Sequence, residues 1–255
     1  MLRRLHPNEY AKIEDLMLRE LGPASLEWLY YFETEKDRII VYSSESLEDC
    51  MTILEGVNIV IVTDSQATLQ DFLRKLDAQK SCAFRCPEWM APTIMGRFPP
   101  KSADYRGVVL LTYSVNEKDF RSYVDDRYTV RILSEGDAEE VTVVYSKSHW
   151  SPEFIRERIR KGAFYGIYEA NKLVSWLGTI WESKKAYEIG FAFTKEECRR
   201  KGLMKTLTSI LTEKALSKGK IPLLHTVKEN LPAIRVAQSL GYSLKAKEWA
   251  YFYNP

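Results

Sequence analysis

The spacing of apolar and polar residues predicts alternating helices and strands in two consecutive halves of the chain. In the first half, apolar side chains recur at helical intervals over 8–21 and again from Leu69 to Leu76. Continuous apolar or aromatic runs, which are typical of buried strands, occupy 26–32, 38–43, 57–63, 81–86 and 104–115. We expect a short helix at 46–56, and residues 88–98 form either a helix broken by Pro92 or an irregular cover.

The second half is predicted to run strand, two helices, three strands, helix, strand, helix, strand. Ser151-Pro152 and Gly162 have the residue types that begin and end a helix. Asn171-Lys172 is typical of a hairpin turn between two strands. The predicted strands are 128–133, 163–170, 172–183, 186–194, 221–227 and 242–253, and the predicted helices are 134–148, 151–162, 202–219 and 230–241.

Length and charge restrict the class of protein. The chain has 255 residues, enough for two domains, and we place the boundary in the polar stretch 116–127. The domains are then 1–120, an N-terminal α/β domain, and 121–255. Lys and Arg number 37 against 35 Asp and Glu, which argues against general binding to nucleic acid or to a membrane surface.

Three further patterns bear on the location of the protein and on metal binding. No apolar run approaches the ~20 residues of a membrane-spanning helix. The first ten residues have no apolar core of the kind a signal peptide needs, so we expect a cytoplasmic protein. Cys82 and Cys86 have no second cysteine pair and no histidine cluster nearby, which predicts buried free thiols and no metal site.

One stretch has the chemistry of an anion site. The predicted strand 186–194 leads into Arg199, Arg200 and Lys201, and Gly202 opens the next helix. The amide groups of a first helical turn lack helical partners, and the helix dipole adds positive potential there. Since the chain is near neutral overall, this local basic turn suits a small phosphorylated ligand.

Three segments together resemble the GNAT superfamily of acyl-CoA-dependent N-acyltransferases. Residues Arg199 to Met204 look like its Q/R-x-x-G-x-G/A pyrophosphate loop, with Met204 departing at the last position. Asn230-x-x-Ala233, continuing to Leu240-Gly241-Tyr242, is similar to its N-x-x-A…L-G-F signature, and EIGFAFT is similar to the strand before the loop. The run from Phe164 to Tyr253 looks most like the FR47-like and glycine N-acyltransferase-like branch.

The resemblance implies a fold class and a coenzyme. The fold would be α/β with a mixed sheet: a C-terminal GNAT-like domain preceded by a smaller α/β domain, which in two-domain members is often a degenerate copy. Acetyl-CoA would be the cosubstrate. Its pantetheine arm would bind the backbone of Phe191, Ala192, Phe193 and Thr194. Its pyrophosphate would bind the amides of Arg199, Arg200, Lys201, Gly202, Leu203 and Met204. Asn230 would face the pantetheine or the reacting carbonyl.

The resemblance also names catalytic candidates. Glu188 lies fourteen residues before Gly202, where some members have their general base; the alternative is a glutamate on the solvent face of a strand. His225 is a second acid/base candidate, against a purely structural strand histidine. Many members have a tyrosine acid where this chain has Ala237, so Tyr242, Ser239 or water would substitute, or the thiolate would leave unassisted. His149 and Trp150 are candidates for contact with the acceptor.

The sequence therefore predicts an N-acetyltransferase that acts on a primary amine of a small molecule, peptide or protein. Three alternatives stay open at this point. One is transfer of a longer acyl group or conjugation of glycine, and another is a non-catalytic acyl-CoA sensor, which Ala237 and Met204 favour. The third is a structural or interaction protein in which the N-terminal domain is the functional half. The expected partners are acetyl-CoA and the amine, with no nucleic acid or membrane, and the chain would be a monomer or homodimer.

Overall fold

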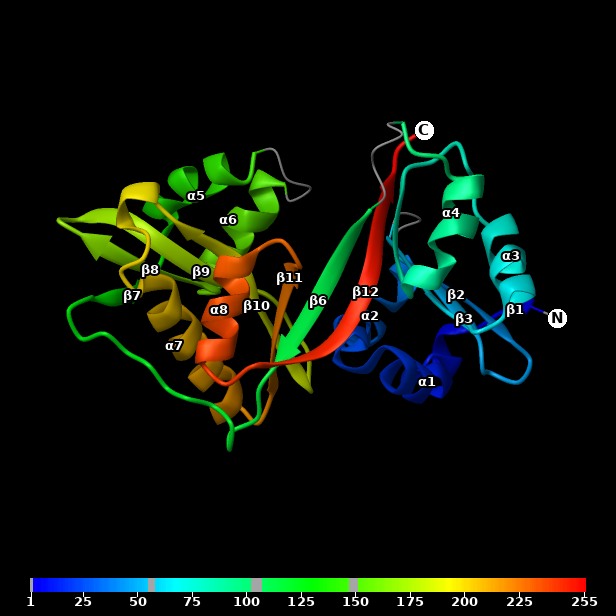
Figure 1. Ribbon diagram of the computed structural model, residues 1–255, viewed down its shortest axis with the longest axis horizontal. Coiled ribbons are helices and arrows are strands. Elements are labelled where there is room, and N and C mark those ends of the chain that lie inside the picture. Colours follow the sequence, from blue (N-terminus) through cyan, green and yellow to red (C-terminus); the bar gives the residue numbers. More distant parts are fainter. Residues whose placement is uncertain (1, 55–57, 102–106, 147–150) are drawn as a thin grey trace. The chain divides into compact units, whose positions relative to one another are not determined.

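The computed structural model describes residues 2–54, 58–101, 107–146 and 151–255, and these fold into two compact units (Figure 1). The first unit comprises Met1–Thr112, Thr226–Asn230 and Leu244–Pro255, and the second comprises Tyr113–His225 and Leu231–Ser243. Each unit is built on strands of a mixed sheet with helices against it.

The elements of the first half follow one another in a regular order. They are β1 (Leu2–Arg4), α1 (Ala11–Leu21), α2 (Leu26–Thr34), β2 (Ile39–Ser44), β3 (Cys50–Leu54), β4 (Asn58–Val62), α3 (Gln66–Arg74), β5 (Cys82–Cys86), α4 (Ala91–Arg97) and β6 (Val108–Ser114).

The second half repeats this order element by element. It contains β7 (Val130–Ile132), α5 (Ala138–Val144), α6 (Pro152–Arg160), β8 (Phe164–Glu169), β9 (Lys172–Glu182), β10 (Ala186–Thr194), α7 (Leu203–Ser217), β11 (Ile221–Val227), α8 (Leu231–Ser239) and β12 (Ser243–Tyr253).

The strand pairings repeat as well. Strands β1 to β4 pair with their neighbours antiparallel, and β4 pairs with β5 in parallel. Strands β7 to β10 likewise pair antiparallel, and β10 pairs with β11 in parallel. The predicted α/β class with a mixed sheet is confirmed, and the repetition supports the view that the first half is a copy of the second.

The last strand joins the sheet of the first unit. Strand β12 pairs antiparallel with β5, from Trp249 opposite Cys86 to Tyr253 opposite Cys82. Residues 244–255 therefore pack with the N-terminal half, so a single cut after residue 120 does not separate the two compact units. The assignment of 1–120 and 121–255 as domains stays a prediction.

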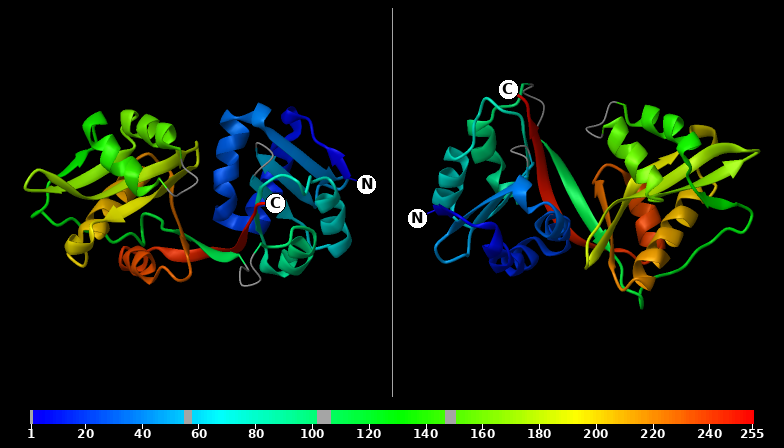
Figure 2. Two further views of the ribbon diagram at one scale, coloured as in Figure 1. Left: turned by 90° about the horizontal axis from the view of Figure 1, so that it is seen from above. Right: turned by 180° about the vertical axis from the view of Figure 1, so that it is seen from behind.

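The sheet of the second unit has helices on both faces (Figure 2), and an apolar core lies under each layer of helices. Helices α5 and α6 cover one face, where Ile155, Phe164 and Trp176 are fully buried. Helix α7 covers the other face, where its Leu207 and Leu211 pack against a cluster that includes Tyr187 and Ile189 of β10. Because neighbouring strand residues point to opposite faces, Glu188 lies on the face of α5 and α6.

Two predicted elements of the first half are wrong. The aromatic run 26–32 suggests a strand, yet it lies in helix α2, where Trp28 and Phe32 are buried at the four-residue spacing of a helix. Residues 46–56 suggest a helix, yet 50–54 form β3, buried on both faces between β2 and β4. A strand buried on both faces shows no alternation, which is why its pattern is misleading.

The proline-rich segment 88–98 forms a short 3-10 turn followed by α4. Pro92 lies in the first turn of that helix, where its missing N–H costs nothing. The helix is therefore not broken by the proline.

Candidate active site

Strand β10 separates from β11 halfway along its length. The parallel pairing runs from Ala186 opposite Ile221 to Ile189 opposite Leu224 and ends there. On its other edge, β10 stays paired with β9 as far as Thr194 opposite Ser175. Within the described residues, the backbone of Gly190 to Thr194 thus has a strand partner on one edge only. On the edge toward β11, the strand pairing of the described residues ends at Ile189.

A bulge shifts the register at the point where the strands separate. Gly190 lies opposite Gly178 and Phe193 opposite Trp176, so that one residue of β9 faces both Phe191 and Ala192. Phe191 has φ 55°, in the left-handed region that a bulky residue rarely adopts. Such a residue costs about 1–3 kcal/mol and persists only when its surroundings hold it in place.

Aromatic packing holds Phe191 in this conformation. Its ring is 6% exposed and lies 5.1 Å from that of Phe164 and 5.5 Å from that of Tyr145, measured between centroids. Because Phe191 fills the core on the α5 and α6 face, its neighbour Ala192 is exposed. The bulge therefore redirects the backbone of β10 immediately beyond Glu188.

The remaining two strand residues of the predicted binding edge are also held by side chains. Phe193 stacks on Trp176 with 4.4 Å between ring centroids, and its carbonyl accepts a hydrogen bond from Ser175 Oγ at 3.0 Å. Thr194 Oγ1 lies 2.7 Å from the same Ser175 Oγ, and the Thr194 carbonyl accepts from Arg199 Nε at 3.2 Å. The end of β10 is thus tied both to β9 and to the basic turn.

The basic turn passes through two left-handed residues before α7 begins. Arg200 and Gly202 both have positive φ, 64° and 85°, and α7 begins at Leu203. The first bond of the helical kind runs from the Thr206 amide to the Gly202 carbonyl at 3.0 Å. The amides of Leu203, Met204 and Lys205 therefore precede it and lack a helical partner.

The side chains of the turn divide into exposed cations and buried anchors. Arg199, Arg200 and Lys201 are exposed, and Lys201 lies 3.6 Å from Glu169. Among the described residues, Arg199 and Arg200 have no carboxylate partner. Leu203 is buried in the α7 core and Met204 packs against the same cluster, so the Met204 side chain is directed toward apolar neighbours.

Sequence reasoning missed a contact to the basic turn from the polar stretch 116–127, which it interpreted only as a domain boundary. The ring of Tyr123 lies beside Gly202, its amide donates to Ser209 Oγ at 2.9 Å, and Lys205 Nζ lies 4.4 Å above the ring. The two aromatic residues in this charged segment, Phe120 and Tyr123, are the signal that could have indicated such a contact.

Glu188 and His225 form a buried pair. Glu188 Oε1 lies 2.9 Å from His225 Nδ1, and the two side chains are 6% and 12% exposed. The contact joins β10 to β11 at the last paired position, because His225 follows Leu224 directly. Glu188 Oε2 is fully buried and has no hydrogen-bond partner among the residues that the structure describes. Glu188 is therefore not the solvent-facing glutamate of the alternative interpretation.

The remaining candidates lie around α8. Asn230 belongs to the first compact unit, and its amide donates to the Val227 carbonyl at 3.0 Å; its contact with the coenzyme stays a prediction. Ala237 is buried. Tyr242 is also buried, its hydroxyl lies 2.6 Å from Thr212 Oγ1, and burial raises its pKa. Ser239 Oγ donates to the Val236 carbonyl. His149 and Trp150 lie outside the described residues.

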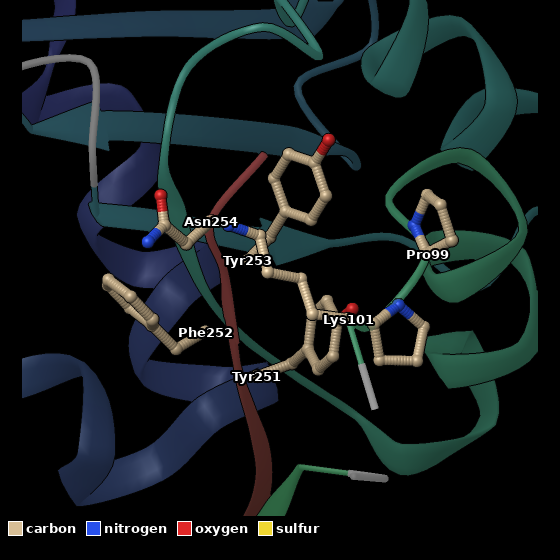
Figure 3. A pocket seen from close by; sticks show the side chains of 7 residues that line it. Pro99, Lys101, Tyr251, Phe252, Tyr253 and Asn254 are labelled. Atoms are coloured by element: carbon tan, nitrogen blue, oxygen red, sulfur yellow. The ribbon is translucent and has the colours of Figure 1, made fainter. Parts of the chain in front are cut away.

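A pocket of about 200 Å³ lies elsewhere, in the first unit (Figure 3). It is lined by Pro99, Pro100, Lys101, Tyr251, Phe252, Tyr253 and Asn254. The hydroxyls of Tyr251 and Tyr253 donate to the carbonyls of Phe98 and Ala78, so they are used within the fold. None of the predicted site residues lines this pocket.

Metal and membrane features were sought in the described part of the chain. No group of three or more His, Cys, Asp or Glu side chains there is arranged to hold a metal ion. No helix among the described ranges combines the length and the apolar character of a membrane span. All four cysteines are free and buried, which confirms the prediction for Cys82 and Cys86.

Comparisons with known proteins bear on the fold of the chain. Residues 164–250 match the FR47-like protein family, and no curated protein sequence matches the chain. Among solved structures, a Drosophila protein is 16% identical, with a TM-score of 0.71 and coverage of 98% of this chain and 97% of that one. A GCN5-related N-acetyltransferase from Sphaerobacter thermophilus is 13% identical, with a TM-score of 0.64 and coverage of 99% and 94%.

An acetyltransferase of the GNAT family from Colwellia psychrerythraea is 12% identical and is matched over 100% of both chains, with a TM-score of 0.59. Similarity at these identities establishes the fold, and the family match covers the segment from β8 to β12. The chain therefore has the fold of these GNAT-family structures, and its residues 164–250 match the FR47-like family, to which the sequence resemblance also points.

Proposed function

We propose that the protein is an acyl-CoA-dependent N-acyltransferase, and that it transfers an acetyl group from acetyl-CoA to a primary amine. The observation that carries the proposal is the arrangement around β10: an open strand edge, a basic turn at a helix start, and a buried carboxylate between them. These three features supply what acyl transfer to an amine requires.

The open edge and the turn would hold the coenzyme. The backbone groups of Phe191 to Thr194 would bind the pantetheine arm in the manner of an added strand, because the pairing of β10 with β11 ends at Ile189. The free amides at the start of α7, with Arg199 and Arg200 beside them, would hold the pyrophosphate. Asn230 would contact the pantetheine or the carbonyl.

The chemistry needs a base, because alkylammonium groups have pKa values of about 10 and an ammonium has no electron pair for attack. The acceptor loses one proton to Glu188, directly or through water, and the freed electron pair on nitrogen attacks the thioester carbonyl carbon. As the carbon–sulfur bond breaks, the sulfur leaves as the coenzyme A thiolate and the nitrogen releases its second proton to water. Ala237 has no group that protonates the thiolate, so water or an unassisted departure completes the reaction.

The test combines binding and turnover. Calorimetry with coenzyme A and acetyl-CoA measures binding, and free thiol is followed with acetyl-, octanoyl- and benzoyl-CoA against a panel of amines, amino acids and peptides. Arg199→Glu should weaken coenzyme binding severely, whereas the matched charge reversal Lys172→Glu, at an exposed hairpin position, should leave it unchanged.

The outcomes separate the alternatives. Thiol release with acetyl-CoA and an amine supports the proposal, and release only with octanoyl- or benzoyl-CoA indicates a longer-chain or glycine-type enzyme. Binding without turnover for any donor and acceptor indicates a sensor. An unchanged affinity in Arg199→Glu would show that the turn does not hold the pyrophosphate.

A further inference from the structure

The two oxygens of the Glu188 carboxylate have different surroundings. Oε1 is held by His225 Nδ1 at 2.9 Å, whereas Oε2 is buried with no hydrogen-bond partner in the described part of the chain. A buried carboxylate oxygen without a partner is costly, and it is retained where a ligand or a function supplies the missing contact. In this carboxylate, His225 therefore fixes Oε1, whereas Oε2 still has room for a hydrogen-bond partner.

The strands explain why the contact has this form. Glu188 lies opposite Leu223 of β11, so His225, two residues further along β11, points to the same face as Glu188. On the β9 side, Glu188 lies opposite Trp181. The nearby carboxylate Glu182 is paired with Lys218 and Lys220. His225 is thus the ionisable side chain that contacts the Glu188 carboxylate among those described.

The direction of the hydrogen bond follows from charge. An ionised carboxylate can only accept, so Nδ1 must carry the proton when Glu188 acts as a base. A histidine that donates from Nδ1 to the carboxylate cannot accept a proton at that nitrogen. Its effect on Glu188 is to fix the carboxyl plane and to leave Oε2 as the accepting atom.

We propose that His225 is a positioning residue for Glu188: it donates from Nδ1 to Oε1 and holds the carboxylate so that Oε2 takes the proton of the attacking amine. This inference rests on the proposed function. The amine N–H bond breaks, its proton forms a bond to Oε2, and the electron pair stays on nitrogen for the bond to the acyl carbon. His225 changes neither its protonation nor its bonding in this step.

The first experiment examines the pair without turnover. The chain has three histidines, so two-bond ¹H–¹⁵N spectra of histidine-labelled protein identify His225 by the signals lost in His225→Asn. The expected result is a protonated Nδ1 at neutral pH, and a changed tautomer balance in Glu188→Leu. A neutral ring protonated at the other nitrogen, or spectra unaffected by Glu188→Leu, would overturn the inference.

The second experiment measures the kinetic consequence with an acceptor found in the amine panel. His225→Leu removes the donor and should lower kcat at least about tenfold, a part of the 10²–10⁴ that a general base supplies, with coenzyme affinity unchanged. His225→Asn keeps an N–H donor near the position of Nδ1 and should recover most of the rate.

A merely structural histidine would behave differently. In that case His225→Leu and His225→Asn would show equal rates at equal thermal stability, and this result would overturn the positioning role. Wild-type protein that is inert with every donor and acceptor would instead refute the proposed function, and the spectra would still decide the pairing.

Discussion

The hydroxyl oxygen of Tyr123 lies 3.0 Å from the point that a Cβ atom would occupy on Gly202. Gly202 also has φ 85°, so the start of α7 requires a residue without a side chain for two separate reasons, conformation and space. The basic turn therefore requires a glycine at position 202, where Tyr123 of the polar stretch 116–127 lies against it.

Replacing this glycine should disturb the turn and its ligand together. Gly202→Ala is expected to lower the free energy of unfolding by about 1–2 kcal/mol through its left-handed φ, and to weaken coenzyme A binding as Tyr123 is displaced. Denaturant unfolding and calorimetry measure the two effects.

The chain offers a matched control in Gly219, at the other end of α7. It has φ 66° and nothing within 4 Å of an added Cβ, so Gly219→Ala should cost similar stability and leave coenzyme binding intact. Equal loss of binding in the two variants would mean that the effect is general destabilisation.

Glu188→Gln should separate catalysis from binding. An amide cannot accept the amine proton as a carboxylate does, so kcat should fall about 10²–10⁴-fold while the Kd for coenzyme A stays unchanged. Glu182→Gln is the control, because this carboxylate lies opposite Tyr187, next to Glu188, and is paired with Lys218 and Lys220. Wild-type kcat in Glu188→Gln would assign the base elsewhere.

One coenzyme should bind per chain, although the fold is repeated. The turn between β4 and α3 corresponds to the basic turn, but Ser65 Oγ accepts from the Thr68 amide at 3.2 Å and Thr63 Oγ1 from the Ser65 amide at 3.0 Å. The exposed Asp64 adds a negative charge. We expect a stoichiometry near one by calorimetry, and a value near two would contradict this comparison.

The cysteine thiols of the protein should contribute little signal in an assay that measures the release of free thiol. Burial raises the pKa of Cys50 to about 12 and of Cys82 to about 11, and it raises that of Cys86 as well. At pH 8 roughly one thiol in a thousand or fewer is then ionised at these positions, and only the thiolate reacts. A disulfide reagent should react slowly with the native protein, and it should react with four thiols per chain in denaturant. Fast reaction of the native protein would show that these cysteines are accessible.

Sequence reasoning was strongest where local chemistry decides the structure. Helix α7 and the turn before it follow from Gly202 and from the apolar spacing of the helix, and β9 and β10 from their apolar runs. It failed at α2 and β3, where aromatic residues in a helix and a strand buried on both faces contradict the usual patterns.

The amino-acid sequence by itself determined the order of elements around the candidate site, the basic turn and the identity of the carboxylate. Only the tertiary structure decided how these groups are held. Glu188 meets His225 across 37 positions because β10 and β11 pair in parallel. Phe191 adopts a left-handed conformation because the rings of Tyr145, which follows α5, and of Phe164 in β8 pack against it. Local propensity acts over a few residues, whereas such contacts depend on strand register and core packing, which no short stretch of sequence specifies.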